Sequence, residues 1–138
     1  MAFRILLDAN ILLDFTLKRP GYEVSRRLME WVVKGRVQAF VTPAIMQTMQ
    51  MWLREAYGEE KAKTLLLALL SEVRVIDTGH EVVVSALHST MGGLEAAIPY
   101  YAALHHKLDY FVSRDVMLKK AATRVLPVVT PEELMEQG

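Results

Sequence analysis

Apolar residues in this chain occur in two patterns, short continuous runs and stretches with helical spacing. Short apolar runs bounded by turn residues predict buried strands, here at residues 3–7, 37–41, 73–77, 109–113 and 126–129. Apolar residues that recur every three or four positions predict helices. These helices are expected over residues 11–17, 22–34, 43–57, 59–71, 79–91, 94–107 and 116–122, with a short one opened by a capping box at 130–133. Pro99 is expected to break or bend the 94–107 helix.

Strands that alternate with helices are typical of a mainly parallel sheet covered on both faces. We therefore expect an α/β fold, a three-layer α/β/α arrangement with residues 1–138 forming a single domain. No internal repeat, low-complexity tract or linker divides the chain. In such sheets ligands bind beyond the carboxyl ends of the strands, where the strand order reverses.

Composition narrows the function classes. Of the 138 residues, 52% are hydrophobic and 23% charged, which is typical of a globular domain. The formal net charge is zero, which argues against a protein that holds nucleic acid mainly by bulk charge. The absence of cysteine excludes disulfides, thiolate metal sites and a cysteine nucleophile. The longest apolar run, Leu65–Leu70, is too short for a membrane span, and a cytoplasmic protein is the expectation.

Acidic residues lie next to two predicted central strands. Asp8 and Asp115 follow strands, and Glu95 opens the helix before the fourth strand. Three carboxylates in one crevice repel each other unless they bind a cation or take up protons. An all-oxygen site without cysteine suits Mg²⁺ or Mn²⁺. Such a site predicts metal-dependent cleavage of a nucleic acid backbone.

Each acid also has a purely structural interpretation. Asp8 and Asp115 are suited to cap helices, and Glu95 in a first helical turn is favoured by the helix dipole. Asn10 is expected either to cap a helix or to orient Asp8 by a hydrogen bond. Asp14 is interpreted as a structural or solvated acid rather than a metal ligand.

Two segments carry a resemblance to a known family. Residues 5–20, which contain Asp8, Asn10 and Asp14 and continue into an Arg-Pro turn, resemble the opening of a PIN domain. The segment opened by Glu95 and the strand end 108–115 resemble the family's later motifs. The resemblance covers essentially the whole chain in strand and helix order.

PIN domains are small α/β/α nucleases that act mostly on RNA, and many are the toxins of toxin–antitoxin pairs. The resemblance implies that Asp8, Glu95 and Asp115 are catalytic and hold Mg²⁺ or Mn²⁺, with Ser113 and Asn10 in support. It also implies RNA as the substrate, an antitoxin as a partner, and a homodimer, since relatives often dimerise.

The chain departs from the family at the second acid, which relatives carry on the helix after strand two. Gln47 or Thr48 stands where that glutamate is expected. A neutral side chain there weakens cation binding, which leaves open an alternative function, a catalytically weak or inactive PIN scaffold that binds RNA or a protein. A phosphatase that uses Asp8 as nucleophile is less favoured, because Asn10 cannot act as its proton donor.

Basic residues and an apolar stripe are the remaining candidates for contacts with RNA or with a partner. Lys18, Arg19 and Arg114 are the candidates for contacts with RNA phosphates, and Arg114 is the best placed beside Asp115. Met46, Met49, Trp52 and Leu53 form a stripe on the predicted 43–57 helix. Core packing is the expected role of this stripe, with self-association as the alternative.

Overall fold

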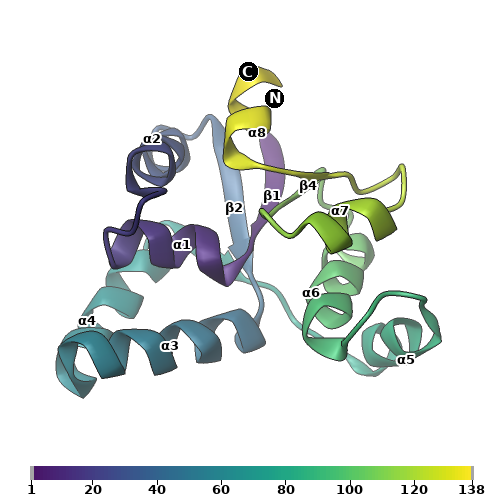
Figure 1. The fold of residues 1–138 in the computed structure, drawn as a ribbon, viewed down its shortest axis with the longest axis horizontal. Helices are drawn as coiled ribbons and strands as arrows, with labels where there is room; N and C mark the ends of the chain where they lie inside the picture. Colours follow the sequence, from purple (N-terminus) through teal and green to yellow (C-terminus); the bar gives the residue numbers. More distant parts are fainter. Residues whose placement is uncertain (1, 138) are drawn as a thin grey trace.

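A computed structural model describes residues 2–137, which form one five-stranded sheet and eight helices (Figure 1). The strands are β1 (Phe3–Leu7), β2 (Val37–Val41), β3 (Val73–Val75), β4 (Tyr110–Val112) and β5 (Val128–Val129). The helices are α1 (Ala9–Thr16), α2 (Tyr22–Val33), α3 (Pro43–Tyr57), α4 (Glu59–Leu70), α5 (His80–His88), α6 (Leu94–His105), α7 (Val116–Ala121) and α8 (Pro131–Gln137).

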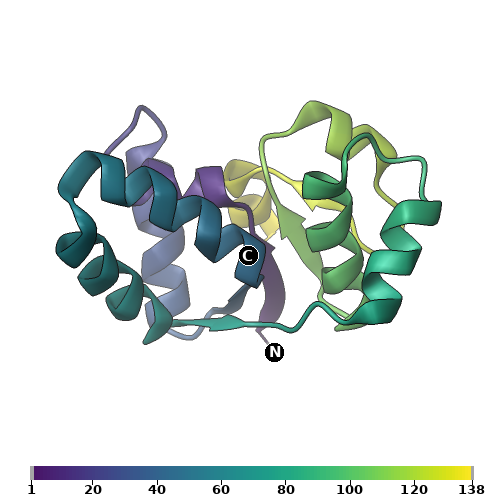
Figure 2. The ribbon, with the colours of Figure 1, turned by 90° about the horizontal axis from the view of Figure 1, so that it is seen from below.

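Every strand pairing in the sheet is parallel, and the strand order is β3-β2-β1-β4-β5. The chain leaves central β1 in one direction through β2 and β3, and then returns to its other side with β4 and β5. Helices α1–α4 gather on one side of the sheet and α5–α7 on the other, as Figures 1 and 2 show. This confirms the predicted α/β/α fold, and it puts the reversal of strand order between β1 and β4.

The core is built around β1, because its neighbours cover it on both edges and both faces. Ile5, Leu6 and Leu7 are fully buried. Burial on both faces explains why this strand is a continuous apolar run rather than an alternating one. The backbone N–H of Asp8 donates to the carbonyl of Val112 at 3.1 Å, which extends the pairing of β1 and β4 to the strand ends.

Helix caps explain several element boundaries. Asp8 caps α1, and Thr42 caps α3 by accepting from the N–H of Ile45 at 3.2 Å. The predicted capping box before α8 is confirmed: Thr130 and Glu133 each accept a hydrogen bond from the other's backbone N–H, at 3.1 and 2.9 Å. Lys18, with φ of 53°, ends α1 in the left-handed conformation, and the N–H of Arg19 donates to the carbonyl of Asp14 at 3.0 Å.

The structure corrects some expected boundaries. Helix α6 continues through Pro99 instead of breaking there. The carbonyl that loses its helical partner to Pro99 belongs to Glu95, an exposed residue in the first turn. Strands β3 and β5 are both shorter than predicted. Strand β5 is limited by its neighbour, because it pairs only with Phe111 and Val112 of the short strand β4. Within residues 2–137 no helix is long and apolar enough to cross a membrane.

Candidate active site

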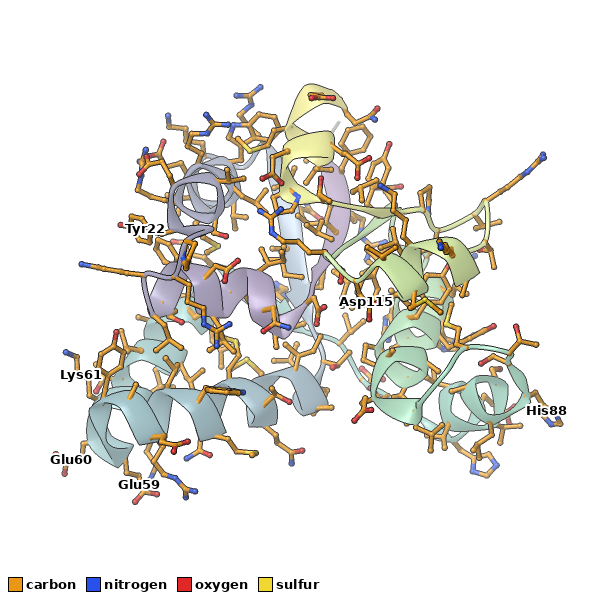
Figure 3. All side chains as sticks on the ribbon, viewed as in Figure 1. Tyr22, Glu59, Glu60, Lys61, His88 and Asp115 are labelled. Carbon is orange, nitrogen blue, oxygen red and sulfur yellow. The ribbon has the colours of Figure 1, made fainter. Side chains whose placement is uncertain are left out.

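A pocket of about 500 Å³ opens beyond the carboxyl ends of β1 and β4, at the reversal of strand order. Its walls come from the start of α1, one face of α3, the start of α6 and the start of α7. The polar side chains that line it are Asp8, Asn10, Thr48, Glu95 and Asp115. Figure 3 shows Asp115 between α1 and α6. Asp77, which also follows a strand, does not line this pocket.

Asp8 is held at the base of the pocket by two hydrogen bonds. Its Oδ1 accepts from the backbone N–H of Ala9 at 2.8 Å, and its Oδ2 accepts from Ser113 Oγ at 2.8 Å. Burial raises the pKa of the Asp8 carboxyl, and the nearby charge of Asp115 adds to that rise. The hydrogen bonds from Ser113 and Ala9 oppose it. The two hydrogen bonds therefore fix the orientation of the Asp8 carboxylate, while its negative charge is only partly compensated.

Asp115 combines a structural role with a place in the pocket. Its Oδ1 accepts from the N–H groups of Met117 and Leu118 at 3.0 and 3.1 Å, which caps α7. Its own N–H donates to Ser113 Oγ at 3.0 Å. Among residues 2–137 no donor reaches Asp115 Oδ2, so this oxygen remains available to a cation or water. The capping interpretation is confirmed, and it leaves half of the carboxylate free.

Glu95 lines the opposite wall of the pocket and is exposed. Its side chain turns back toward Gly93, where a Cβ atom would lie 3.3 Å from Glu95 Oε1. Gly93 has a φ of 75°, which favours glycine. Between residues 2 and 137 no three acidic or histidine side chains are close enough to hold one metal ion together. The sequence-predicted acids thus share a pocket, but only Asp8 and Asp115 are joined, through Ser113.

The donor set fits a hard divalent cation. Asp8 and Asp115 offer carboxylate oxygens, and Mg²⁺ is commonly bound by one or two carboxylates while it keeps several waters. Mn²⁺ prefers the same oxygen ligands. The partly buried Asp8 carboxylate is the group with most to gain from a cation, because burial has removed part of its hydration.

Helix α3 distinguishes the two candidates for the position of the missing acid. Thr48 lines the pocket, and Gln47 does not. Thr48 Oγ1 donates to the carbonyl of Ala44 at 3.2 Å. Of the two candidates, Thr48 is therefore the one that faces the pocket, and Gln47 is exposed beside it.

Trp52 also lines the pocket, which the sequence did not predict. Met49 and Leu53 are buried as expected of a core stripe, but the indole of Trp52 is 50% exposed and lines the pocket. The interpretation of Trp52 as a core residue is wrong, because it lies one turn beyond Thr48 on the pocket face of α3. The sequence did contain a signal for this position, because Trp52 follows Thr48 by four residues and such a pair shares one face of a helix.

Asn10 is hydrogen-bonded to Arg19 and not to Asp8 in the structure of residues 2–137. Its Oδ1 accepts from Arg19 Nη1 at 3.2 Å, and the same nitrogen lies 3.9 Å from Asp14 Oδ1. Arg19 thus lies at the rim of the pocket, held by residues of α1. Lys18 is exposed next to it.

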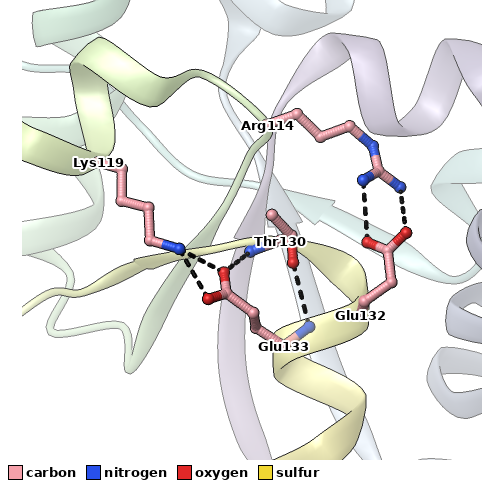
Figure 4. Close-up of polar contacts among 5 residues, drawn as sticks. All are labelled: Arg114, Lys119, Thr130, Glu132 and Glu133. Atoms are coloured by element: carbon pink, nitrogen blue, oxygen red, sulfur yellow. Dashed lines mark hydrogen bonds and ion pairs between the residues drawn. The ribbon is translucent and has the colours of Figure 1, made fainter.

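Arg114 is turned toward α8 rather than into the pocket. Its two terminal nitrogens donate to the two carboxylate oxygens of Glu132 at 2.9 and 3.0 Å, and Lys119 donates to Glu133 in the same region (Figure 4). The pair with Arg114 lowers the pKa of the Glu132 carboxyl. Arg114, which was predicted to contact an RNA phosphate, is therefore engaged in an ion pair with Glu132.

Comparison with solved structures agrees with this fold. The structures that share it include the following three. VapBC2 from Rickettsia felis bound to a promoter DNA fragment is 14% identical, with a TM-score of 0.73 over 93% of this chain and 98% of that one. A toxin–antitoxin complex from Klebsiella pneumoniae is 21% identical, with a TM-score of 0.67 over 92% and 97%. VapC20 from Mycobacterium tuberculosis, described as a sarcin-ricin loop cleaving toxin, is 12% identical, with a TM-score of 0.68 over 86% and 95%.

Curated proteins include no match to the sequence. The model of the PIN domain family, in contrast, matches residues 4–117, which contain β1 from its second residue, β2 to β4, and the whole pocket except Leu118. A match over most of the chain identifies the family, and this chain belongs to the PIN domain family.

Proposed function

We propose that this PIN domain protein is a metal-dependent endoribonuclease in which Asp8, Glu95 and Asp115 are the catalytic acids. The observation that carries the proposal is the junction of Asp8 and Asp115 through Ser113 at the carboxyl ends of β1 and β4. A half-buried carboxylate beside a second one has an unfavourable interaction that a bound cation relieves.

Mg²⁺ or Mn²⁺ would be held by Asp8 and Asp115, and Glu95 on the opposite wall would act through a water that the cation keeps. When bound, the cation would supply Lewis-acid stabilisation of the charge that develops on the scissile phosphate. Ser113 is a positioning residue in this proposal, because its hydroxyl fixes the direction of the Asp8 carboxylate. Arg19 and Lys18 at the rim provide positive charge for the RNA backbone.

The proposal extends to biological role. Solved structures with the same fold include toxin–antitoxin complexes, and we infer that this chain is the toxin of such a pair, acting as a single domain in the cytoplasm. An antitoxin would be its partner and a homodimer its assembly. The likeness in fold supports this inference, and the test is whether a neighbouring gene product binds the protein and blocks cleavage.

A second candidate function is a PIN scaffold that binds RNA or protein without efficient cleavage. The specific observation in its favour is Thr48, a neutral residue on the pocket face of α3. One carboxylate fewer reduces the attraction for a cation. The two candidates make the same prediction for RNA binding and opposite ones for cleavage.

The deciding experiment combines Mn²⁺ titration by calorimetry with incubation of end-labelled RNA. We expect saturable Mn²⁺ binding and cleavage by the wild type, and loss of both in Asp8→Asn. Asp77→Asn is the matched control, since Asp77 is a strand-end acid outside the pocket. RNA that stays intact with wild type at saturating Mn²⁺ would favour the scaffold, and cleavage that persists in Asp8→Asn would contradict the proposed site.

A further inference from the structure

A large aromatic side chain, Trp52, lines the acidic pocket and is half exposed there. Half of the surface of Trp52 is accessible, although the neighbouring Met49 and Leu53 on α3 are fully buried. Ala44, Thr48 and Trp52 follow one another at intervals of four residues, and all three line the pocket. Trp52 therefore lies on the pocket face of α3, one turn beyond the position of the missing acid.

The guanidinium of Arg19 lies over the indole of Trp52, with Cζ 5.4 Å from the ring centroid. The turn that ends α1 brings Arg19 back along its own helix, and the hydrogen bond to Asn10 and the ion pair with Asp14 keep it there. Both contacts use Nη1. Among residues 2–137 no acceptor is hydrogen-bonded to Nε or Nη2, so these groups can donate to a ligand.

An exposed indole beside an anchored guanidinium matches the two parts of a nucleotide. Unpaired bases stack on aromatic side chains, and every base offers a π-face for this contact. Arginine forms directed hydrogen bonds with phosphate oxygens. The remaining walls carry Asp8, Glu95 and Asp115, an environment that suits a polar, anionic ligand brought together with a cation rather than an apolar peptide side chain.

We propose that Trp52 is a stacking platform for one unpaired base of single-stranded RNA, and that Arg19 contacts the phosphate next to that base. This inference rests on the proposed ribonuclease function and names the form of its substrate. Trp52 sets the position of a base relative to the acids, so that RNA is bound as an unpaired strand and duplex RNA is disfavoured. Trp52 is a positioning residue here, because the chemistry remains with the acids.

Binding of a short fluorescein-labelled single-stranded RNA, followed by anisotropy with Asp8→Asn as the parent protein, tests this proposal without cleavage of the probe. Added to that parent, Trp52→Leu should weaken binding about ten-fold, as expected for loss of one stacked base. Trp52→Tyr should stay within about two-fold, because it retains an aromatic face. Duplex RNA of the same composition should bind more weakly and show no dependence on Trp52.

Trp31 provides a matched control, since it also lies under an arginine, Arg36, at 4.1 Å, but on α2 and away from the pocket. Trp31→Leu should leave RNA affinity unchanged. In a Trp31→Phe protein Trp52 is the only tryptophan, and its fluorescence should be quenched by the RNA. Thermal melts establish that each variant is folded before it is compared.

Equal affinity of Trp52→Leu and its parent for single-stranded RNA would overturn the proposal, as would an equal loss in Trp52→Tyr. Unchanged RNA affinity together with an altered sedimentation coefficient would assign the indole to a protein interface, which also overturns it. The proposed function is tested separately by cleavage with wild-type protein and Mn²⁺. Cleavage without a Trp52 effect overturns only the stacking platform, and Trp52-dependent binding without cleavage overturns only the ribonuclease.

Discussion

Ser113 Oγ donates a 2.8 Å hydrogen bond to Asp8 Oδ2, although the two residues are 105 positions apart in the chain. The same hydroxyl oxygen accepts from the N–H of Asp115 at 3.0 Å. One buried serine therefore joins both strand-end acids. Because its proton is committed to Asp8, it favours the ionised carboxylate there and counteracts part of the effect of burial.

Asp8→Asn should raise the melting temperature of the metal-free protein by a few degrees, because it removes a half-buried charge that Asp115 repels. Differential scanning calorimetry with and without Mn²⁺ measures both effects. The wild type should be stabilised by Mn²⁺ and the variant should not. Asp77→Asn should behave as the wild type. The same Mn²⁺-induced shift in Asp8→Asn and wild type would show that Asp8 does not bind the cation.

The stability advantage of Asp8→Asn should depend on pH. Folding raises the pKa of Asp8 above its ordinary value of 3.8. At a pH between 3.8 and the folded-state pKa, the folded protein therefore binds more protons than the unfolded chain. The unfavourable contribution of Asp8 is therefore full at neutral pH and is lost as pH falls through the folded-state pKa. Chemical denaturation of both proteins across this range should show their unfolding free energies converging toward acid pH. A constant difference would indicate that the carboxyl is not perturbed by folding.

Thr48→Glu should tighten Mn²⁺ binding about ten-fold, because it adds a carboxylate to the pocket face of α3. Without metal it should lower the melting temperature, since the new charge lies in the same pocket as Asp8. Isothermal titration calorimetry and thermal melts measure the two effects. Gln47→Glu is the control, with the same charge one residue away on the exposed surface, and it should change neither quantity. Equal effects of the two variants would argue against a specific role of the pocket face.

Glu132→Gln should release Arg114 from its bidentate ion pair and allow it to contact RNA. The unfolding free energy should fall by no more than about 1 kcal/mol, because the pair is partly exposed. RNA affinity should rise, and the slope of log affinity against log salt should steepen by about 0.7, the value for one extra phosphate contact on a single strand. Glu136→Gln on the same helix is the control. An unchanged salt slope would mean that Arg114 is a purely structural residue.

Tyr100→Phe should lower the unfolding free energy by about 1–3 kcal/mol, because it leaves buried groups without a partner. The phenol donates to the carbonyl of Leu126 at 2.7 Å and accepts from the N–H of Thr123 at 2.7 Å. It thereby holds the segment between α7 and β5. Tyr101→Phe, beside it but half-buried, should be nearly neutral. Urea denaturation of both variants provides the comparison, and equal stabilities would refute this role of the Tyr100 hydroxyl.

Local signals in the sequence accounted for most of the fold. Thr42 before Pro43 and the Thr130–Glu133 capping box each specify a helix start through contacts within a few residues. The continuous apolar run of β1 is a local pattern that indicates a strand buried on both faces. The lengths of β3 and β5 were not predictable in the same way, because strand length depends on the neighbouring strand. The helix does not break at Pro99, because the cost of a proline depends on where the unpaired carbonyl lies.

Long-range geometry limited prediction of the site. Asp8 and Asp115 were identifiable because the ends of adjacent parallel strands meet at one edge. The ion pair of Arg114 with Glu132 involves a helix that follows the motif, and nothing in the local sequence reveals it. Trp52 was missed because a stripe of methionine, tryptophan and leucine has the composition of a core, and only the tertiary arrangement shows which face of α3 is covered.

The strand order also determines when the acid pair can exist during synthesis. Asp8 is made well before Asp115, and its strand can pair with β2 early, but its other neighbour β4 starts only at Tyr110. Chains grow at roughly 5–20 residues per second, so Asp8 waits for several seconds before Ser113 and Asp115 have been made. A nascent chain that ends before β4 carries one acid without the other. Any chemistry that requires both acids is therefore delayed until β4 and the start of α7 have been made.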